Sequence, residues 1–220
     1  MAGAGEYPYP RYGHFSMNVT LIGIAGGSGS GKSRLAQDIQ NTIGPDRVSI
    51  VPFDAYYKDL RDLALEERNA INFDHPDSLD EDLFGFQLDG LASGLDVAIP
   101  VYDFGQHRRL DDLSILPATE IIIAEGILLF AFPEIAERFD YTIFRECSED
   151  VRFARRLERD TVERGRSEES VRKQFASSVA PMHDQFVEPS KAGVDRIVTQ
   201  DEDLSNVVAE LSEAILSLRV

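Results

Sequence analysis

One short segment near the start of the chain constrains its fold more than any other. Residues 26–33 read Gly-Gly-Ser-Gly-Ser-Gly-Lys-Ser and match the pattern G-x-x-x-x-G-K-[ST]. An apolar run, residues 19–25, precedes the segment, and residues 32–43 carry apolar side chains at helical spacing. Glycines let the backbone curl so that several N–H groups face one point at the start of a helix, where an anion binds. The sequence therefore predicts a strand, a phosphate-binding loop and a helix.

The residue types of this loop suit a nucleoside triphosphate with magnesium. Lys32 can reach the β- and γ-phosphates, and the Ser33 hydroxyl can bind Mg²⁺. A Gly/Ser-rich turn with a solvent-exposed lysine is the alternative, but the complete pattern between a strand and a helix favours the phosphate loop. The residues predicted to bind the nucleotide are Gly26, Gly27, Ser28, Gly29, Ser30, Gly31, Lys32 and Ser33.

Apolar runs alternate with amphipathic helical segments along the rest of the chain. Continuous apolar runs are typical of strands buried on both faces of a parallel sheet. The alternation predicts an α/β fold with three layers, of the P-loop NTPase type, with a parallel sheet, a β-hairpin insert and a helical lid. The expected strands are residues 19–25, 47–51, 120–124, 141–144 and 194–198, and the expected helices include residues 32–43, 78–91 and 204–218.

The chain is predicted to consist of a tail and one folded domain. Residues 1–16 are rich in Gly, Pro and Tyr without periodicity, which indicates a flexible tail. Residues 17–220 are expected to form the domain, with the hairpin at about 97–116 and the lid at about 149–180. The spacing of Ser78 and Glu81 matches a capping box, so Ser78 is expected to cap the helix that follows.

The composition excludes several kinds of partner. The formal net charge is −17, so the surface repels nucleic acid and anionic membranes. No apolar run approaches the length needed to cross a bilayer, and the N-terminal residues lack the pattern of a secretory signal. Cys147 is the only cysteine, so no internal disulfide can form, and a cytoplasmic location is expected.

Two acidic residues stand where predicted strands end. Asp54 follows the run at residues 48–53, and Glu125 follows residues 121–124. The carboxyl ends of strands form the ligand crevice of a doubly wound fold, so both carboxylates are expected near the magnesium–nucleotide. A solvated loop acid is the alternative for each, and the phosphate loop favours the functional interpretation. Gly126, next to Glu125, is expected to let a ligand approach the backbone closely.

Arginines gather on a predicted helix at residues 149–164, although the chain is acidic overall. Arg152, Arg156 and Arg159 share one helix face. Positioned arginines stabilise the charge on a transferring phosphoryl group, and a hinged helix pair can close over it. A salt-bridged surface helix is the alternative.

That alternative is preferred for Arg152 and Arg155, whereas spacing alone does not decide for Arg156, Arg159, Arg164 and Arg166. Gly165 is expected to end the helix, and Ser167 to cap the next one.

Taken together, these residues resemble the uridine kinase (uridine–cytidine kinase) family, from about Met17 to Val198. The first motif alone would indicate only a phosphate loop, but the ordered set is specific. The motifs are Gly23-Ile-Ala-Gly-Gly-Ser-Gly-Ser-Gly-Lys-Ser33, Phe53-Asp-Ala-Tyr-Tyr-Lys58, Asn72-Phe-Asp-His-Pro-Asp77, Ile99-Pro-Val-Tyr-Asp-Phe104 with His107, Glu125-Gly-Ile-Leu128, Arg155-Arg-Leu-Glu-Arg-Asp160, Arg164-Gly-Arg166 and Phe186-Val-Glu-Pro-Ser-Lys191.

The resemblance implies phosphorylation of the 5′-hydroxyl of uridine or cytidine, with ATP or GTP as the donor and Mg²⁺ as the metal. It implies that Asp54 is the general base and lies near Mg²⁺, which Ser33 and Glu125 hold. It also implies a homotetramer, although no pattern in the chain indicates the interface. The residues implied to face the triphosphate are Lys32, Arg159, Arg164 and Arg166.

For the nucleoside, the resemblance implies a ribose site and a base site. A carboxylate suits a ribose diol, and aromatic walls with one polar tip suit a flat base. Without the resemblance, His107 would be interpreted as a surface histidine, and Tyr102 and Phe104 as ordinary strand residues. The implied ribose ligands are Asp74, Arg156 and Gln174, the base is enclosed by Tyr102, Phe104 and His107, and Tyr57 and Phe73 pack beside the nucleoside.

Three alternatives stay open from the sequence. Another kinase on the same scaffold, similar to phosphoribulokinase or bacterial pantothenate kinase, would share the phosphate loop and differ in the acceptor site. A nucleotide-binding regulator without turnover, or an NTP-hydrolysing switch, would need no acceptor at all.

Overall fold

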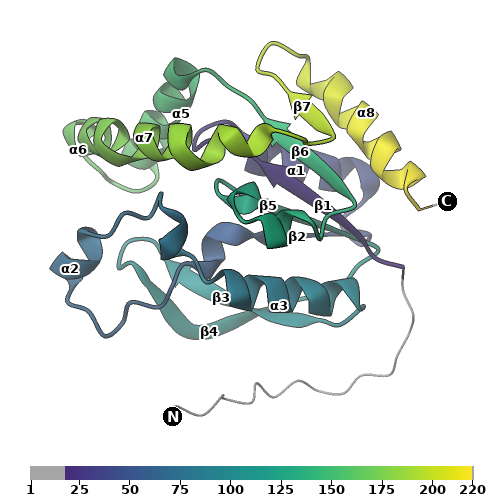
Figure 1. Cartoon of the computed structure of the whole chain (residues 1–220), viewed down its shortest axis with the longest axis horizontal. Coiled ribbons are helices and arrows are strands. Elements are labelled where there is room, and N and C mark those ends of the chain that lie inside the picture. The colour runs from purple at the N-terminus through teal and green to yellow at the C-terminus, as the bar shows by residue number, and fades with distance from the viewer. Residues whose placement is uncertain (1–17, 220) are drawn as a thin grey trace.

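A five-stranded parallel sheet forms the centre of the molecule (Figure 1). The structure is a computed structural model that describes residues 18–219, so the predicted tail at residues 1–16 lies outside the described residues. The strand order is β2-β5-β1-β6-β7, and every neighbouring pair is parallel, as the sequence predicts. The strands are β1 (Thr20–Ala25), β2 (Val48–Pro52), β5 (Ile121–Gly126), β6 (Tyr141–Arg145) and β7 (Arg196–Val198).

The two central strands bring the phosphate loop and Glu125 together. Every residue of β1 and β5 is buried, which is why both read as continuous apolar runs. In their register, Ile24 pairs with Glu125 and Ala25 with Gly126. The segment that follows β1 therefore leaves the sheet beside the end of β5.

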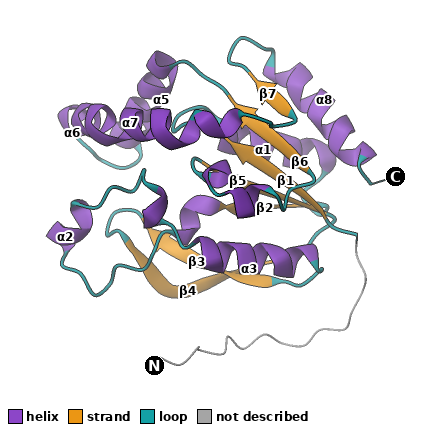
Figure 2. Ribbon diagram, in the orientation of Figure 1, coloured by secondary structure: helices purple, strands orange, loops and turns teal. Residues whose placement is uncertain are grey.

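Helices cover both faces of the sheet, which gives the predicted three layers (Figure 2). On one face, α1 (Lys32–Ile43) and α8 (Leu204–Ser217) pack Leu35 and Leu211 against Ile22 and Ile24. On the other face, α3 (Glu81–Ala92) packs Phe84 into a second apolar cluster with Phe53. Two short helices, α2 (Leu65–Asn69) and α4 (Pro133–Ala136), lie in connections. Among residues 18–219, no helix has the length and apolar character needed to span a membrane.

The start of α3 differs from the sequence prediction. Ser78 lies in a 3₁₀ turn, where its hydroxyl donates to the carbonyl of His75 at 2.7 Å. Asp80 caps α3 instead, because its carboxylate accepts the N–H of Leu83 at 3.1 Å. Glu81 is thus the first helical residue, and the capping-box interpretation of Ser78 is wrong.

The predicted hairpin is present and stands apart from the main sheet. Strands β3 (Val97–Asp103) and β4 (Arg108–Leu116) pair in antiparallel fashion, with a register shift between Pro100 and Tyr102. In the turn between them, the Asp103 carboxylate accepts the N–H groups of two residues, Gly105 and Gln106. These two hydrogen bonds close the turn that joins β3 to β4.

A bent helical segment lies above the carboxyl ends of the strands. It consists of α5 (Glu149–Val162), α6 (Glu168–Gln174) and α7 (Ala180–Met182), with π-helical turns at Phe175–Val179 and His183–Val187. Gly165, with φ of 63°, makes the bend between α5 and α6. Ser167 then caps α6 by accepting the N–H of Ser170, as predicted. We call this segment the lid.

Candidate active site

The phosphate loop curls between β1 and α1 with two of its glycines in left-handed conformations. Gly29 and Gly31 have φ of 82° and 91°, which residues with a side chain rarely adopt. A Cβ on Gly29 would also collide with the backbone carbonyl of Arg152. Gly31 immediately precedes α1, so the loop's N–H groups and the helix start face the same point. This geometry is suited to bind phosphate oxygens.

Lys32, Ser33 and Glu125 meet at the end of the phosphate loop. The Ser33 hydroxyl donates to Glu125 Oε1 at 3.0 Å, and Lys32 Nζ lies 3.9 Å from Glu125 Oε2. Lys32 and Glu125 are both buried. Burial raises the pKa of Glu125, although the Lys32 charge opposes that rise. A second positive charge at this point would favour the ionised carboxylate.

These oxygen groups fit the requirements of a magnesium ion. Mg²⁺ prefers oxygen ligands and is usually bound by one or two carboxylates together with substrate phosphates. Ser33 and Glu125 provide a hydroxyl and a carboxylate oxygen 3.0 Å apart beside the phosphate loop. Within the described part of the chain no group of three or more His, Cys, Asp and Glu residues could hold a metal. In kinase sites Mg²⁺ usually takes its remaining ligands from waters and substrate phosphates.

Asp54 follows β2, whose last residue, Pro52, pairs with Glu125, and it precedes Tyr57, the first of a group of aromatic side chains, by three residues. It lies in a 3₁₀ turn (Phe53–Tyr56) directly after β2 and is half-buried. Its charge raises the pKa values of Glu125 on one side and of Tyr57 and Asp74 on the other, in each case after the larger effect of burial. Asp54 is thus close to both halves of the site.

Gly126 has a different role from the expected one. A Cβ at this position would lie 2.6 Å from Cβ of Phe53, so the missing side chain makes room for the turn that carries Asp54. The glycine therefore allows β5 to pack closely against this turn. The sequence had suggested that it allows a ligand to approach the backbone.

Five aromatic rings pack against one another close to Asp54. Tyr57 contacts Phe73, Tyr102 and Phe104, with ring centroids 5.4, 5.3 and 6.4 Å apart. His107 stacks on Phe73 at 4.4 Å with an interplanar angle of 13°. All five positions predicted from the family resemblance therefore come together, from three separate segments. We call Tyr57, Phe73, Tyr102, Phe104 and His107 the aromatic slot.

Two polar groups of the slot have properties that suit a ligand. The Tyr102 hydroxyl is buried and has no hydrogen-bond partner among the described residues. A buried hydroxyl is normally paired, so this one is available to bond a ligand or an ordered water. Burial, followed by the Arg166 charge, lowers the pKa of His107, which keeps the ring neutral near pH 7. His107 also has φ of 49°, a conformation that is costly for a residue with a side chain.

Asp74 directly follows Phe73 of the slot and lies close to the other predicted ribose ligands. It is buried, and its Oδ2 accepts a hydrogen bond from the Ser178 hydroxyl at 3.2 Å. Burial raises the pKa of Asp74, although the Arg156 charge acts in the opposite direction. Gln174 Oε1 accepts from Arg156 Nη2 at 3.1 Å, which joins the remaining two predicted ligands. Sequence reasoning missed Ser178, although it follows Gln174 by one helical turn.

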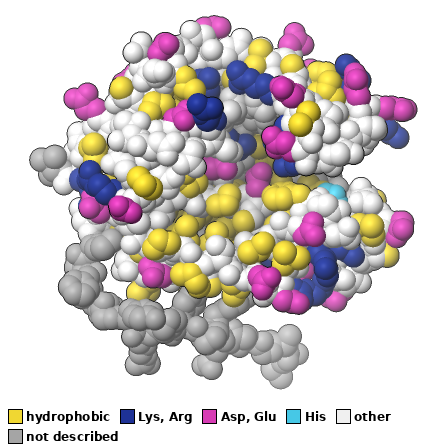
Figure 3. Space-filling view, turned by 180° about the vertical axis from the view of Figure 1, so that it is seen from behind, with side chains coloured by type: hydrophobic (Ala, Val, Ile, Leu, Met, Phe, Trp, Pro, Cys, Tyr) yellow, Lys and Arg dark blue, Asp and Glu magenta, His cyan; other side chains and the backbone are white. Residues whose placement is uncertain are grey.

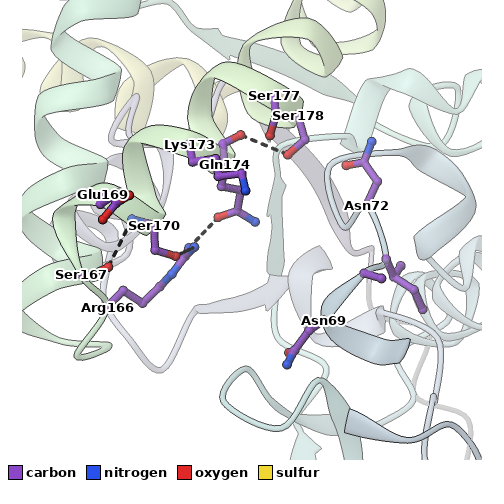
Figure 4. Close-up of a pocket in the computed structure, with 12 residues that line it drawn as sticks. Asn69, Asn72, Arg166, Ser167, Glu169, Ser170, Lys173, Gln174, Ser177 and Ser178 are labelled. Carbon is purple, nitrogen blue, oxygen red and sulfur yellow. Dashed lines mark hydrogen bonds between the residues drawn. The ribbon is translucent and has the colours of Figure 1, made fainter. Parts of the chain in front are cut away.

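A cavity of about 580 Å³ opens between the lid and the loop before Asp74 (Figure 4). Gln174 and Ser178 line it from the lid, and Asn69 at the end of α2 and Asn72 in the loop that follows face them. Figure 3 shows the molecule from behind the view of Figure 1. On that side the surface is hollowed between the upper and lower parts, and hydrophobic side chains lie in the hollow. The volume lies within the range of small-molecule sites.

The lid arginines face the phosphate loop and the slot. Arg156 Nη1 donates to Ser28 Oγ in the loop at 2.7 Å. The Arg164 guanidinium lies over the Phe104 ring, 5.2 Å from its centroid. Arg159 and Arg166 both donate to Asp160, a fully buried residue for which no role was predicted from the sequence.

One prediction about the lid is wrong. Arg152 was expected on a salt-bridged surface, but it is buried against Gly27 of the phosphate loop. The cause is that α5 begins at Glu149, so its first turn packs directly on the loop. Arg155 is exposed, as expected, and its Nη1 donates to the Ser30 carbonyl at 3.2 Å.

A phosphate loop beneath a basic lid, with a separate slot beside a carboxylate, defines a kinase of the P-loop class. A family model described as "Phosphoribulokinase / Uridine kinase family" matches residues 21–205. The chain belongs to this family.

Curated relatives agree with that membership, and a solved structure shares the fold. A uridine kinase of Chloroflexus aurantiacus is 48% identical over 177 residues, 80% of this chain and 85% of the relative. A uridine kinase of Halobacterium salinarum is 41% identical over 192 residues, 87% and 84% of the two chains. A D-glycerate 3-kinase structure from Cryptococcus neoformans has a TM-score of 0.61 at 16% identity and covers 83% of this chain and 86% of its own. The last likeness concerns the fold alone.

Proposed function

We propose that this protein transfers the γ-phosphate of ATP or GTP to the 5′-hydroxyl of uridine or cytidine. The observation that carries the proposal is the position of Asp54, which lies two residues after Pro52, the register partner of Glu125, and three residues before Tyr57 of the aromatic slot. The curated relatives named uridine kinase support the same substrate class.

In this proposal the slot selects a pyrimidine nucleoside. The rings of the slot provide walls for a flat base, and the unpaired Tyr102 hydroxyl and the neutral His107 ring read its polar edge. The Asp74 carboxylate accepts hydrogen bonds from the ribose 2′- and 3′-hydroxyls, with Arg156 and Gln174 beside it. A nucleoside held at both ends directs its 5′-hydroxyl toward Asp54.

Phosphoryl transfer then needs positioning and charge stabilisation more than covalent chemistry. Asp54 accepts the proton of the 5′-hydroxyl, and the hydroxyl oxygen attacks the γ-phosphorus in line. The bond from the γ-phosphorus to the β–γ bridging oxygen breaks, and the nucleoside diphosphate leaves. Lys32 and the lid arginines Arg159, Arg164 and Arg166 stabilise the charge on the transferring group.

Magnesium, when bound, would neutralise charge on the β- and γ-phosphates. Ser33 and Glu125 would hold it, with Asp54 close by. The wider expectations from the family resemblance, a role in pyrimidine salvage and a homotetramer, belong to the same proposal.

Phosphoribulokinase-like and pantothenate-kinase-like activities are the nearest alternatives, since the family description includes the first of them. The acceptors of these enzymes, ribulose 5-phosphate and pantothenate, are acyclic, and ribulose 5-phosphate is a phosphate ester. The aromatic slot favours a ring-containing, uncharged acceptor.

An acceptor screen tests the proposal. ADP release would be measured with uridine, cytidine, ribulose 5-phosphate and pantothenate as acceptors, with an acceptor-free control. We expect release with the two nucleosides alone. Release with another acceptor would assign a different kinase activity, and tight ATP binding without acceptor-dependent release would indicate a regulator or a hydrolytic switch.

A further inference from the structure

Asp160 lies in the last turn of α5 and is surrounded by arginines. Its side chain has no exposed surface. Arg159 donates to Oδ1 from Nε at 3.0 Å and from Nη2 at 2.8 Å. Arg166 Nη1 lies 3.3 Å from Oδ2, Arg156 Nε 3.5 Å from Oδ2, and Arg164 Nη1 3.7 Å from Oδ1. We call these four arginines the arginine cluster.

Three of the four arginines also contact other parts of the candidate active site. Arg156 reaches Ser28 in the phosphate loop and Gln174 on the lid. Arg166 Nη1 also donates to Gln174 Oε1, at 2.5 Å. Arg164 reaches Phe104 at the mouth of the aromatic slot. One carboxylate thus stands at the junction of the lid, the donor site and the acceptor site.

Charge balance does not account for this arrangement. Four guanidinium groups surround one carboxylate, so the cluster keeps an excess of positive charge. Burial would raise the pKa of Asp160, but the Arg159 and Arg156 charges outweigh burial and lower it, so the carboxylate is ionised. Without the Asp160 carboxylate, the four guanidinium groups would repel one another, and their orientations would no longer be fixed. The geometry therefore indicates that Asp160 orients the four arginine side chains.

We propose that Asp160 is a positioning residue for phosphoryl transfer: it fixes the arginine cluster in the orientation that stabilises the transferring phosphate. The proposal rests on the proposed function, because it assigns a task within the same site. It differs from a neutralising role, since removal of a neutralising carboxylate would leave a more positive and better ATP site.

Two substitutions separate geometry from charge. Asp160→Asn keeps the shape and removes the charge, and Asp160→Glu keeps the charge and moves it outward by one methylene. We expect kcat for uridine, per folded enzyme, to fall by about 10²-fold in the Asn variant, since small displacements of catalytic groups cost that much. The Glu variant should lose kcat by about 10-fold, while KM for ATP changes little in either. Glu163→Gln, which removes an exposed charge from the same helix end, is the matched control and should match the wild type.

Other results would overturn the proposal. A neutralising role predicts a lower KM for ATP with kcat unchanged in Asp160→Asn, and wild-type kinetics in Asp160→Glu. A purely structural role predicts loss of folded fraction, measured by circular dichroism at the assay temperature, with normal kcat per folded molecule. Should Asp160→Asn fail to fold, the Glu variant decides alone.

A double-mutant cycle tests whether Asp160 acts through the arginines. In an Arg159→Ala background, Asp160→Asn should cost at least tenfold less in kcat than it does in the wild type, because one target of the positioning is already gone. Additive losses would contradict the proposal.

Failure of the proposed function is distinguishable from failure of this inference. A wild-type chain without nucleoside-dependent ADP release would refute the kinase assignment. The readout would then be hydrogen exchange of residues 159–167 with a non-hydrolysable ATP analogue. ATP-dependent protection in the wild type and its absence in Asp160→Asn would support positioning, and equal protection in both would overturn it.

Discussion

The phosphate loop and the aromatic slot are built in contrasting ways. The loop is one run of eight consecutive residues, and its binding groups are mostly backbone N–H groups fixed by glycine conformations. The slot is made of side chains from three segments that meet only in the folded chain. A contiguous backbone site tolerates little change in sequence, and it can therefore be predicted from the sequence. A site assembled from distant side chains can vary, and this is where members of one kinase family can differ in their acceptors.

The first prediction concerns the point where the two regions meet. Asp54→Asn should lower kcat by about 10²–10⁴-fold, because the proton acceptor is lost while both binding regions remain. Steady-state kinetics with uridine and ATP would measure this, with the exposed Asp62→Asn as the control on the same connection. Wild-type turnover in Asp54→Asn would remove Asp54 from its assigned role.

The second prediction asks whether the slot can be damaged without affecting the loop. Asp74→Asn should raise KM for uridine by about 10- to 100-fold, since a hydrogen bond to a charged group contributes about 1.5–3 kcal/mol. KM for ATP should stay within about twofold. The exposed Asp77→Asn, three residues away, serves as the control. A comparable rise in both KM values would show that the two regions do not bind separately.

The third prediction uses the unpaired Tyr102 hydroxyl. Tyr102→Phe should raise KM for the nucleoside by about fivefold, from a neutral hydrogen bond of about 1 kcal/mol. The same change should raise the unfolding temperature of the free protein, because a buried hydroxyl without a partner is removed. Kinetics and thermal unfolding would be compared with Tyr141→Phe, a tyrosine on β6. A lower unfolding temperature with unchanged KM would show that the hydroxyl serves the fold.

The fourth and smallest effect is a pH dependence confined to the slot. Asp74 must be ionised to accept both ribose hydroxyls, and its pKa is raised by burial. As the pH falls, uridine affinity should therefore weaken at higher pH than for an exposed aspartate, whose pKa is about 3.9. Calorimetric titration of uridine across acidic pH would measure it, and Asp74→Asn should flatten that dependence. An unchanged profile in the variant would assign the titration to another group.

The same contrast explains how far the sequence alone could be interpreted. The strand, loop and helix around Lys32 were predictable because spacing and residue type fix them locally. The parallel sheet followed from buried apolar runs such as β5. Residues whose role depends on tertiary contacts were missed or misassigned. Arg152 was expected on the surface, and Asp160 and Ser178 had no assigned task, because helical spacing does not reveal which face packs on the phosphate loop.

The residues of the aromatic slot were predicted from the family resemblance and not from a periodic sequence pattern. From the residues alone, His107 would be a surface histidine and Tyr102 an ordinary strand residue. The structure stacks His107 on Phe73 and buries the Tyr102 ring against Tyr57. A long-range aromatic cluster of this kind leaves no periodic signal in the chain.

In the proposed reaction, one acceptor alcohol, presented by the slot, meets one triphosphate held by the loop. Phosphorus NMR would identify the product after incubation of the protein with ATP, Mg²⁺ and uridine. We expect uridine 5′-monophosphate in a one-to-one ratio with ADP. ADP with free phosphate and unchanged uridine, or phosphate on a ribose 2′- or 3′-oxygen, would rule out the proposed reaction.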